Sequence, residues 1–517
     1  MTWEPEIEEI AQRTRRAMQL GGPERVQDQH DRGKLTVRER IDALIDEGSF
    51  LERGVLAGSG EYDDDGRLTE FMPASFVMGV ADILGRPVVV GGGDYTARAR
   101  PSSGREVSKS AVAERMALDL RLPMVRLIDG FGADIRAIES IGRTYIPANP
   151  QFEVVAALLG EVPVVSIALG AVAGWPAAAV TASHFSVMVQ GISQVFAAGP
   201  PVVARALGHP IDKEELGGVQ VHARGSGVVD NEAASEVEAF EQVRRFLSYL
   251  PGNVHELPPV AASEDPADRC DDELVSLIPR DRRRPYNVRK MIEHVVDRGS
   301  MFEIGRGGGR AQVTTFARLD GRPVGVLAND PMVHGGATDA DSAQKLEKFV
   351  DLCDTFHLPV VNFVDNPGFM IGHGAESSGT LKQGVRAITA IYQARVPWAT
   401  VVVRRVYGVA GAGHQDHSRY NYRIAWPSGE WGSIPIEGGV MAAYRRQIEA
   451  AEDPEAYRAD LERRLVQMRS PFRTAESFNA EDIVDPRQTR PLLCNWVRLA
   501  YRVLPPLAGP TARHMRP

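Results

Sequence analysis

The chain is poor in cysteine, with only Cys270, Cys353 and Cys494 among its 517 residues. Three scattered thiols are too few for a disulfide framework and too few for a four-cysteine zinc site. Scarce, unpaired cysteine is typical of proteins that work in a reducing compartment, so we expect a cytoplasmic protein.

Long apolar runs and an excess of positive charge are also missing. No stretch reaches the roughly 18 apolar residues of a membrane span, and the start, MTWEPEIEEIAQRTRRAM, is acidic rather than typical of a secretion signal. The net charge of −9 gives no footprint for nucleic acid. The sequence also lacks a P-loop and a Gly-x-Ser-x-Gly elbow. We therefore expect no membrane and no nucleic-acid partner.

What the chain does contain is an internal repeat. LPMVRLIDGFGADI (122–135) and LPVVNFVDNPGFMIGHG (358–374) both read as a buried parallel strand that ends in a glycine-rich loop. Val37 and Gly48 are matched by Val288 and Gly299, and Gly85-Arg86-Pro87 by Gly321-Arg322-Pro323. Landmarks in one order at nearly constant spacing indicate a duplication. We predict α/β domains at 1–255 and 281–517, a linker at 256–280 and a loose tail after Ala508.

Four glycine-rich strand ends could carry chemistry. They are Asp129–Ala133 and Gly170–Gly174 in the first half, and Asp365–Phe369 and Tyr407–Gly411 in the second. A turn of this kind that opens a helix leaves N–H groups that suit an oxyanion, such as the enolate of a thioester. The alternative is that the glycines only relieve tight corners.

Other polar groups have weaker signals. His414 and His417, with Asp416 between them, have the spacing of a metal pair on a helix, but a hydrogen-bonded polar loop is the more common arrangement. Arg98, Arg100 and Arg105 follow a strand and could meet phosphates. We expect the run Arg282–Arg284 to coat the linker, because charge runs are usually solvated.

Three longer segments carry a family resemblance. VRERIDALIDEGSFLE (37–52), LGGVQVHARGSGVVDNEAASEVEAF (216–240) and ANDPMVHGGATDADSAQKLEKFVDLCDTFHLPVVNFVDNPGFMIG (328–372) resemble the carboxyltransferase β subunit of biotin-dependent acyl-CoA carboxylases, of the propionyl-CoA and methylcrotonyl-CoA carboxylase type. The similarity covers about 35–490.

The resemblance implies an α/β fold of two tandem crotonase-like (ClpP/crotonase) β-β-α superhelix domains, and a hexamer built as a trimer of dimers. It implies that the first domain takes the acyl-CoA and the second takes biotin. The sequence shows no ATP-grasp region and no Met-Lys-Met biotinylation motif, so carboxybiotin would arrive on a separate carrier, from a biotin carboxylase/biotin carrier α subunit. In the family, the oxyanions are held by main-chain amides and no side-chain base is required.

Carried over by position, the resemblance maps the thioester pocket onto Phe131 and Gly132 and the biotin pocket onto Val409 and Ala410 as catalytic residues, with no metal ligand. The implied substrate-binding residues are Gly130, Ala133, Ala173, Gly174, Trp175, Gly368, Phe369, Gly408 and Ala412. This chain departs from the family at three of these loops, where Phe131, Trp175 and Val409 replace smaller residues. Bulky rings there could narrow the acyl pocket, stack on an unusual acyl group or block biotin entry.

Two other functions stay open. The same oxyanion holes would serve a decarboxylase of a malonyl-type CoA thioester, and the chain could be a non-catalytic core subunit of a carboxylase complex. The acyl chain is not specified by these residues.

Overall fold

The computed structural model describes residues 2–97, 108–132, 135, 138–139, 142–146, 148–149, 151–414 and 420–515. The chain divides into two compact units, Met1–Glu256 with Ala512–Pro517, and Leu257–Thr511. Across the described ranges, no helix is both long and apolar enough to cross a membrane.

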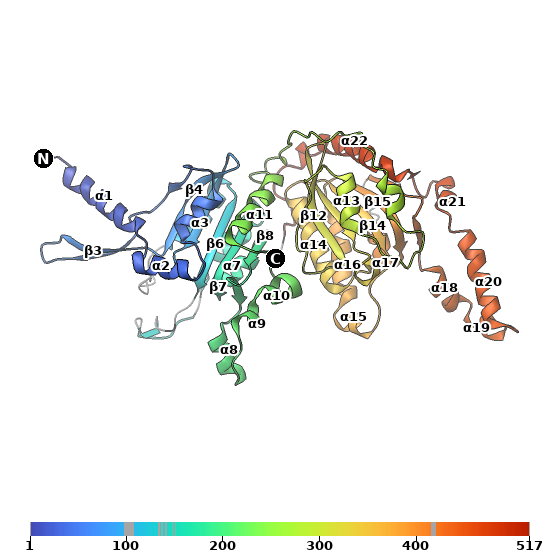
Figure 1. Ribbon diagram of the computed structural model, residues 1–517, viewed down its shortest axis with the longest axis horizontal. Coiled ribbons are helices and arrows are strands. Elements are labelled where there is room, and N and C mark those ends of the chain that lie inside the picture. Colours follow the sequence, from blue (N-terminus) through green and yellow to red (C-terminus); the bar gives the residue numbers. More distant parts are fainter. Residues whose placement is uncertain are drawn as a thin grey trace. The chain divides into compact units, whose positions relative to one another are not determined.

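The first unit is built on a mixed sheet, shown in blue to green in Figure 1. Its strand order is β1-β4-β5-β6-β7-β8-β10, with β9 added beside β7, and β5 to β8 run parallel. A separate ribbon of β2 and β3 packs near α1. The strands are β1 Leu51–Glu52, β2 Gly58–Tyr62, β3 Leu68–Pro73, β4 Phe76–Ile83, β5 Arg86–Gly93, β6 Met124–Phe131, β7 Val164–Ala173, β8 Phe185–Val189, β9 Gln194–Phe196 and β10 Asn231–Ala233. The helices are α1 Glu4–Met18, α2 Pro23–Asp31, α3 Val37–Leu44, α4 Lys109–Leu120, α6 Gln151–Leu158, α7 Trp175–Thr181, α8 Pro200–Leu207, α9 Lys213–Gly217, α10 Val219–Val221, the π-helical η1 His222–Ser226 and α11 Glu236–Tyr249.

The second unit repeats this sheet in the order β11-β12-β13-β14-β15-β16-β18, with β17 beside β15. Each strand takes the place of one in the first unit, from β1 and β11 through to β10 and β18. The strands are β11 Phe302–Glu303, β12 Gln312–Leu319, β13 Arg322–Asn329, β14 Val360–Asn366, β15 Trp398–Tyr407, β16 Asn421–Ala425, β17 Glu430–Gly432 and β18 Asp482–Ile483. The helices are α12 Glu273–Leu277, α13 Val288–Val295, α14 Ala340–Thr355, α15 His373–Ser377, α16 Thr380–Gln393, α17 Gly408–Gly413, α18 Ile436–Ala443, α19 Arg445–Ala450, α20 Pro454–Gln467, α21 Pro471–Glu476 and α22 Thr489–Arg502, with short η2 His334–Gly336, η3 Pro486–Gln488 and η4 Pro505–Leu507.

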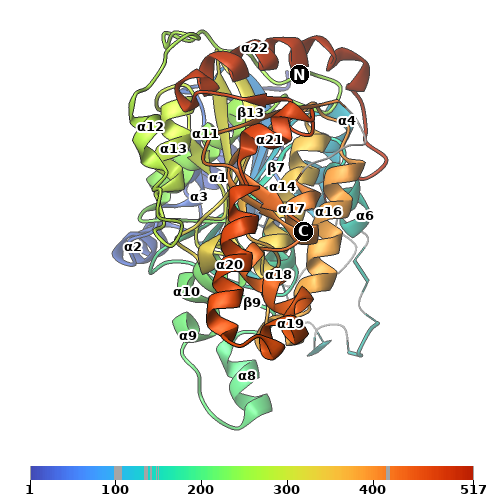
Figure 2. The ribbon, with the colours of Figure 1, turned by 90° about the vertical axis from the view of Figure 1, so that its right-hand side faces the viewer.

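The second sheet has a packed layer of helices on each face. On one face α14 and α16 lie side by side, as Figure 2 shows, and the ring of Phe349 in α14 lies 5.5 Å, centroid to centroid, from that of Phe316 in β12, tilted by 40°. On the other face α13 and α22 enclose an apolar cluster with alternate residues of the strands, Ala317 and Phe363 among them. Strand β14 is buried at every position, as expected for a parallel strand covered on both faces.

The duplication extends to side-chain hydrogen bonds. Asp46 follows α3 and accepts the N–H groups of Leu84 and Gly85, at the β4–β5 hairpin. In the second unit Asp297 follows α13 and accepts the N–H groups of Asp320 and Gly321, at the β12–β13 hairpin. An arginine from a C-terminal helix binds each aspartate: Arg244 reaches Asp46 and Arg490 reaches Asp297, both at 2.9 Å. The predicted fold, two copies of one parallel-rich α/β unit, is confirmed.

Two segments differ from the sequence-based expectation. Residues 257–280 pack on the second unit, where Ala261 N–H donates to Gly321 O and Leu274 is buried. The tail after Ala508 is not loose throughout, because Met515 is fully buried and His514 packs on Gly160 of the first unit. Composition predicted both segments poorly, since a few apolar side chains are enough to anchor a Pro-rich stretch.

Candidate active site

In the first unit the end of β6 meets the start of α7. The parallel pairing of β6 with β7 places Gly130 opposite Val172 and Phe131 opposite Ala173. Gly130 (φ +135°) and Gly174 (φ +69°) adopt conformations that only glycine takes readily. A Cβ atom on Gly132 would stand 2.6 Å from Cδ of Pro176. Strand end and helix start are therefore in direct contact, and glycine makes this approach possible.

The amide groups at this edge have different partners. The N–H of Gly132, a predicted oxyanion donor, donates to the carbonyl oxygen of Ala173 at 3.1 Å. Successive N–H groups of a strand point to opposite sides, so that of Phe131 points away from β7. At the start of α7, Trp175 has an N–H without an intrahelical partner, whereas Pro176 has none. Among the described residues of this edge, the N–H groups of Phe131 and Trp175 are therefore candidate donors.

The second unit has the same junction between β14 and α17. The turn after β14 has Gly368 at φ +127°, and α17 begins at Gly408 with φ +63°. Gly368 N–H donates to the Asn366 side chain at 2.8 Å. Val409, on the first turn of α17, is 65% exposed, whereas Ala410 is buried. The first N–H groups of α17 have no partner within the helix, so Val409 presents a backbone donor at an exposed site.

A buried carboxylate ends the strand in both units. Asp129 of β6 has a side chain only 1% exposed and binds Lys34 at 2.5 Å and Arg40 at 3.0 Å, while Arg40 also binds Glu236 at 2.7 Å. Asp365 of β14 is equally buried and binds Arg404 at 2.9 Å and Arg405 at 2.7 Å. Each carboxylate is neutralised by two cations, which suits it to fixing the strand end and not to moving protons. Burial lowers the pKa of Lys34, and the Asp129 charge opposes this shift.

A histidine lies beneath the second junction. His414, the residue after α17, is 2% exposed and lies between the side chains of Asn362 and Asn366, at 2.9 and 3.0 Å. Burial lowers its pKa to about 4, so the ring is neutral near pH 7. Asp416 and His417 lie outside the described residues. In the ranges that are described, no three His, Cys, Asp or Glu side chains gather as metal ligands would.

Known proteins are similar to this chain in sequence and in fold. The carboxyl transferase domain model matches residues 28–504. The chain belongs to the carboxyl transferase family. It is 32% identical over 495 residues to the propionyl-CoA carboxylase, carboxyltransferase subunit, of Haloferax mediterranei, covering 95% of each chain. It is 30% identical over 499 residues to the methylmalonyl-CoA decarboxylase subunit alpha of Veillonella parvula, covering 96% of this chain and 95% of that one.

A solved structure matches both units of this carboxyl transferase. The transcarboxylase 12S crystal structure, described as a hexamer assembly with hydrolysed methylmalonyl-coenzyme A bound, aligns with a TM-score of 0.85 and 29% identity over 100% of this chain and 98% of that one. The match covers both duplicated sheets, so the crotonase-like architecture predicted for the two units is confirmed.

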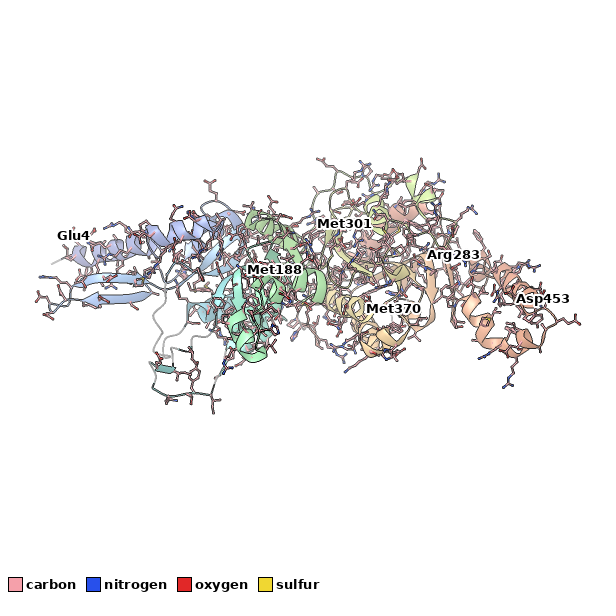
Figure 3. All side chains as sticks on the ribbon, turned by 60° about the horizontal axis from the view of Figure 1, so that its bottom comes forward. Glu4, Met188, Arg283, Met301, Met370 and Asp453 are labelled. Atoms are coloured by element: carbon pink, nitrogen blue, oxygen red, sulfur yellow. The ribbon has the colours of Figure 1, made fainter. Side chains whose placement is uncertain are left out.

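The remaining predicted site residues of the carboxyl transferase lie in different surroundings. Phe131 is 57% exposed, and the Trp175 ring makes an edge-to-face contact with Phe152 at 5.5 Å, so the two bulky residues stand at the first junction. Phe369 pairs with Thr338 and packs its ring on Gly384, while Met370, labelled in Figure 3, continues the segment. Ala412 is exposed on α17.

Ala133 and the three arginines expected near phosphates, Arg98, Arg100 and Arg105, lie outside the described residues.

Sequence reasoning missed the polar groups that hold the junctions of the carboxyl transferase. Arg40 and Glu236 are 196 residues apart, and Asn362 and His414 are 52 apart, so no local pattern links them. Arg282 was expected to coat a linker, but its guanidinium pairs with the buried carboxylate of Glu430. The available signal was the charge itself: an arginine inside an apolar helix face, such as Arg40 in α3, needs a buried partner.

Proposed function

We propose that this carboxyl transferase moves a carboxyl group from carboxybiotin, borne by a separate carrier protein, to the α-carbon of an acyl-CoA. One observation carries the proposal: at equivalent strand ends of two duplicated units, a glycine-containing strand end (Gly130 to Gly132, and Gly368) lies against a helix start that opens at a positive-φ glycine, Gly174 or Gly408. The relatives named propionyl-CoA carboxylase and the methylmalonyl-coenzyme A complex of transcarboxylase 12S support a CoA thioester as substrate.

The reaction needs two oxyanions held at once, and the chain has two sets of donors. When bound, carboxybiotin supplies the carboxyl group and a nitrogen that can take the α-proton. The main-chain donors of the first unit would hold the thioester oxygen as negative charge develops on it. Those of the second unit would do the same for the ureido oxygen of biotin. Removing one such donor typically costs about 3 kcal/mol of barrier. The ion-paired Asp129 and Asp365 keep the strand ends in place for those donors.

We assign the acyl-CoA to the first unit and biotin to the second. The thioester side would use the main chain of Phe131 and Trp175, with Gly130, Gly132, Ala133, Ala173 and Gly174 shaping the corner. The biotin side would use the main chain of Val409 and Ala410, with Gly368, Phe369, Gly408 and Ala412 around it. A biotin carboxylase/biotin carrier α subunit would deliver the carboxyl group. The hexamer of transcarboxylase 12S supports a hexamer for this chain, and we propose that it is built as a trimer of dimers.

The test is a reconstituted assay with a matched pair of variants. The protein is combined with a biotin carboxylase, a biotinylated carrier, ATP, bicarbonate and a panel of short acyl-CoA esters, and carboxylated product is measured. Val409→Pro deletes one amide donor at a first-turn position where proline is tolerated, and it should lower kcat about 100-fold. Val409→Ala keeps the amide and should stay within a few-fold.

A parallel pair tests the first unit. Trp175→Pro removes the N–H at the first position of α7, where proline is favoured, while Trp175→Ala removes only the ring. We expect the proline variant to lose turnover and the alanine variant to change which acyl-CoA is preferred. No carboxylated product from any ester with the wild-type protein, or equal rates for the two members of a pair, would refute the proposal.

A second candidate is decarboxylation of a malonyl-type CoA thioester. The 30% identity to the methylmalonyl-CoA decarboxylase subunit alpha of Veillonella parvula favours it, because one enolate-binding corner serves both directions of the chemistry. CO₂ release from malonyl-CoA or methylmalonyl-CoA without ATP would support decarboxylation. Failure to bind any CoA ester would leave the non-catalytic core subunit.

A further inference from the structure

The buried ring of His414 joins the two loops of the second junction. Its backbone N–H donates to Gly411 O at 3.2 Å, so the residue closes the last turn of α17. Its ring reaches Asn366, the last residue of β14, and Asn362, four positions earlier on the same strand. All three side chains are at most 2% exposed. A single imidazole therefore links the helix that follows one strand to the end of its neighbour.

The donors and acceptors around the ring fix its tautomer. Asn366 Oδ1 accepts the N–H of Gly368 at 2.8 Å, and its Nδ2 donates to Thr338 Oγ1 at 2.9 Å and to His414 Nε2 at 3.0 Å. Nε2 is therefore an acceptor, so the ring proton is on Nδ1. Nδ1–H needs an oxygen, and Asn362 can supply one, because its Oδ1 has no other partner in the described part of the chain and its amide ends exchange by a half turn.

The hydrogen bond that Nε2 accepts helps to fix the turn at Asn366–Gly368. Gly368 has φ +127°, and its N–H is held by the Asn366 side chain, which is in turn held by Thr338 and His414. If Nε2 no longer accepts, Asn366 loses one of the two groups that orient its NH₂, and the turn loses its fixed orientation relative to α17. The neutral state of the ring is what leaves Nε2 able to accept.

In the first unit, a charged side chain makes the corresponding link between strand and helix. Arg126 of β6 takes the place of Asn362, and it binds Glu114 at 2.8 Å and the carbonyl oxygens of Ala179 and Ala182 at the end of α7. In both units a buried side chain from the strand thus ties down the helix that follows the next strand. Only the second unit does so with a neutral histidine that also reaches the glycine turn.

We propose that His414 is a positioning residue for the second unit: its Nε2, and not the bulk of its ring, sets the turn at Asn366–Gly368 against the start of α17 and so sets the affinity for biotin. This inference rests on the proposed function, in which the second unit takes biotin. His414 itself touches no reactant.

Two substitutions separate the two ring nitrogens. A glutamine side chain places its amide near the position of Nε2, and an asparagine side chain near that of Nδ1. His414→Gln therefore keeps a partner for Asn366, whereas His414→Asn keeps one only for Asn362. Each full-length variant is compared with wild type for assembly, for carboxylation of free biotin by methylmalonyl-CoA, and for hydrogen exchange in the peptide that contains Gly368 to Met370.

We expect His414→Asn to raise the KM for biotin about tenfold, the effect of one lost buried hydrogen bond, with the KM for the CoA ester unchanged. Exchange at Gly368 to Met370 should also quicken. His414→Gln should restore both values to within about threefold of wild type. Thr338→Val, which removes the other acceptor of Asn366, should shift the biotin KM in the same direction and keeps the test decisive if a His414 variant does not assemble.

The outcomes separate the role of His414 from the proposed function. A wild-type protein that binds methylmalonyl-CoA but never carboxylates biotin refutes the proposed function, and the inference with it. An active wild type in which the Asn and Gln variants behave alike overturns the inference alone. So does a loss that raises the KM for the CoA ester as much as that for biotin, or a Thr338→Val variant without effect.

Discussion

Replacing Asp365 by asparagine should destabilise the second unit without removing an acid or base from the reaction. The carboxylate is 1% exposed and binds Arg404, whose side chain is 4% exposed, and Arg405, which is 17% exposed. Asparagine keeps the shape but leaves Arg404 as a buried cation without its counter-ion. Breaking a buried pair by removing one partner costs about 3–5 kcal/mol.

The remaining contacts place the effect at the lower end of that range. Arg404 still donates to the carbonyl oxygens of Arg282 and Arg284 and lies 5.0 Å from the ring of Tyr286, while Arg405 keeps the carbonyl oxygen of Gly335. We therefore expect a loss of about 3 kcal/mol. For a unit of this size that corresponds to an apparent Tm lower by roughly 6–12 °C in differential scanning calorimetry.

Asp320→Asn is the matched control, because this carboxylate is 41% exposed and pairs with Arg322 on the β12–β13 hairpin. Its Tm should change by less than about 2 °C, since exposed pairs contribute little. The pH profile of kcat/KM should keep its shape in both variants. An unchanged Tm in Asp365→Asn, or the loss of one limb of the pH profile while Tm holds, would refute the structural role and point to a catalytic carboxylate.

Three further predictions test other parts of the structure. Because burial lowers the pKa of His414 from 6.5 to about 4, the unfolded chain takes up a proton below pH 6.5 that the folded chain refuses. Wild type should thus lose about 3 kcal/mol between pH 6.5 and pH 4, and His414→Gln should lack this loss in pH-dependent melting. Gly408→Ala, at φ +63°, should lower stability by about 1 kcal/mol and impair biotin turnover, whereas Gly374→Ala in open space on α15 should do neither, in the same melting and half-reaction assays. Arg490→Ala should cost about 3 kcal/mol and Arg244→Ala under about 1 kcal/mol, because the first arginine is 1% and the second 29% exposed; equal Tm shifts would contradict this reasoning.

The duplication could be predicted from the sequence because it is recorded in residues with special backbone needs. Gly48 and Gly299 have φ of +72° and +70°, and the hairpin residues Gly85 and Gly321 have +68° and +75°. Few other residues take these conformations at so little cost, so the glycines remain visible in both copies while the surrounding side chains differ. The same holds for Gly174 and Gly408, at φ +69° and +63°, which is why the loops at the two helix starts could be located.

The direction of each amide could not be predicted. Gly132 was expected to offer its N–H to a substrate, but that N–H belongs to the β6–β7 ladder. Which amide points outward depends on strand register, and the register shifts between Ile128 and Gly130. A shift of one residue exchanges the sides to which successive N–H groups point, and no composition or spacing signal records it.

The two copies differ in the buried polar side chains that support each junction, which could not be predicted from the sequence. Both keep a buried carboxylate at the strand end, yet the first balances it with Lys34 and Arg40 from outside the strand pair, and the second with Arg404 and Arg405 from the adjacent strand β15. Below it, one copy uses the Arg126–Glu114 pair and the other the neutral His414. Because the two backbone junctions are similar while their supports differ, the supports are where two copies of one fold can be adapted to different ligands, such as the two oxyanions of the proposed reaction.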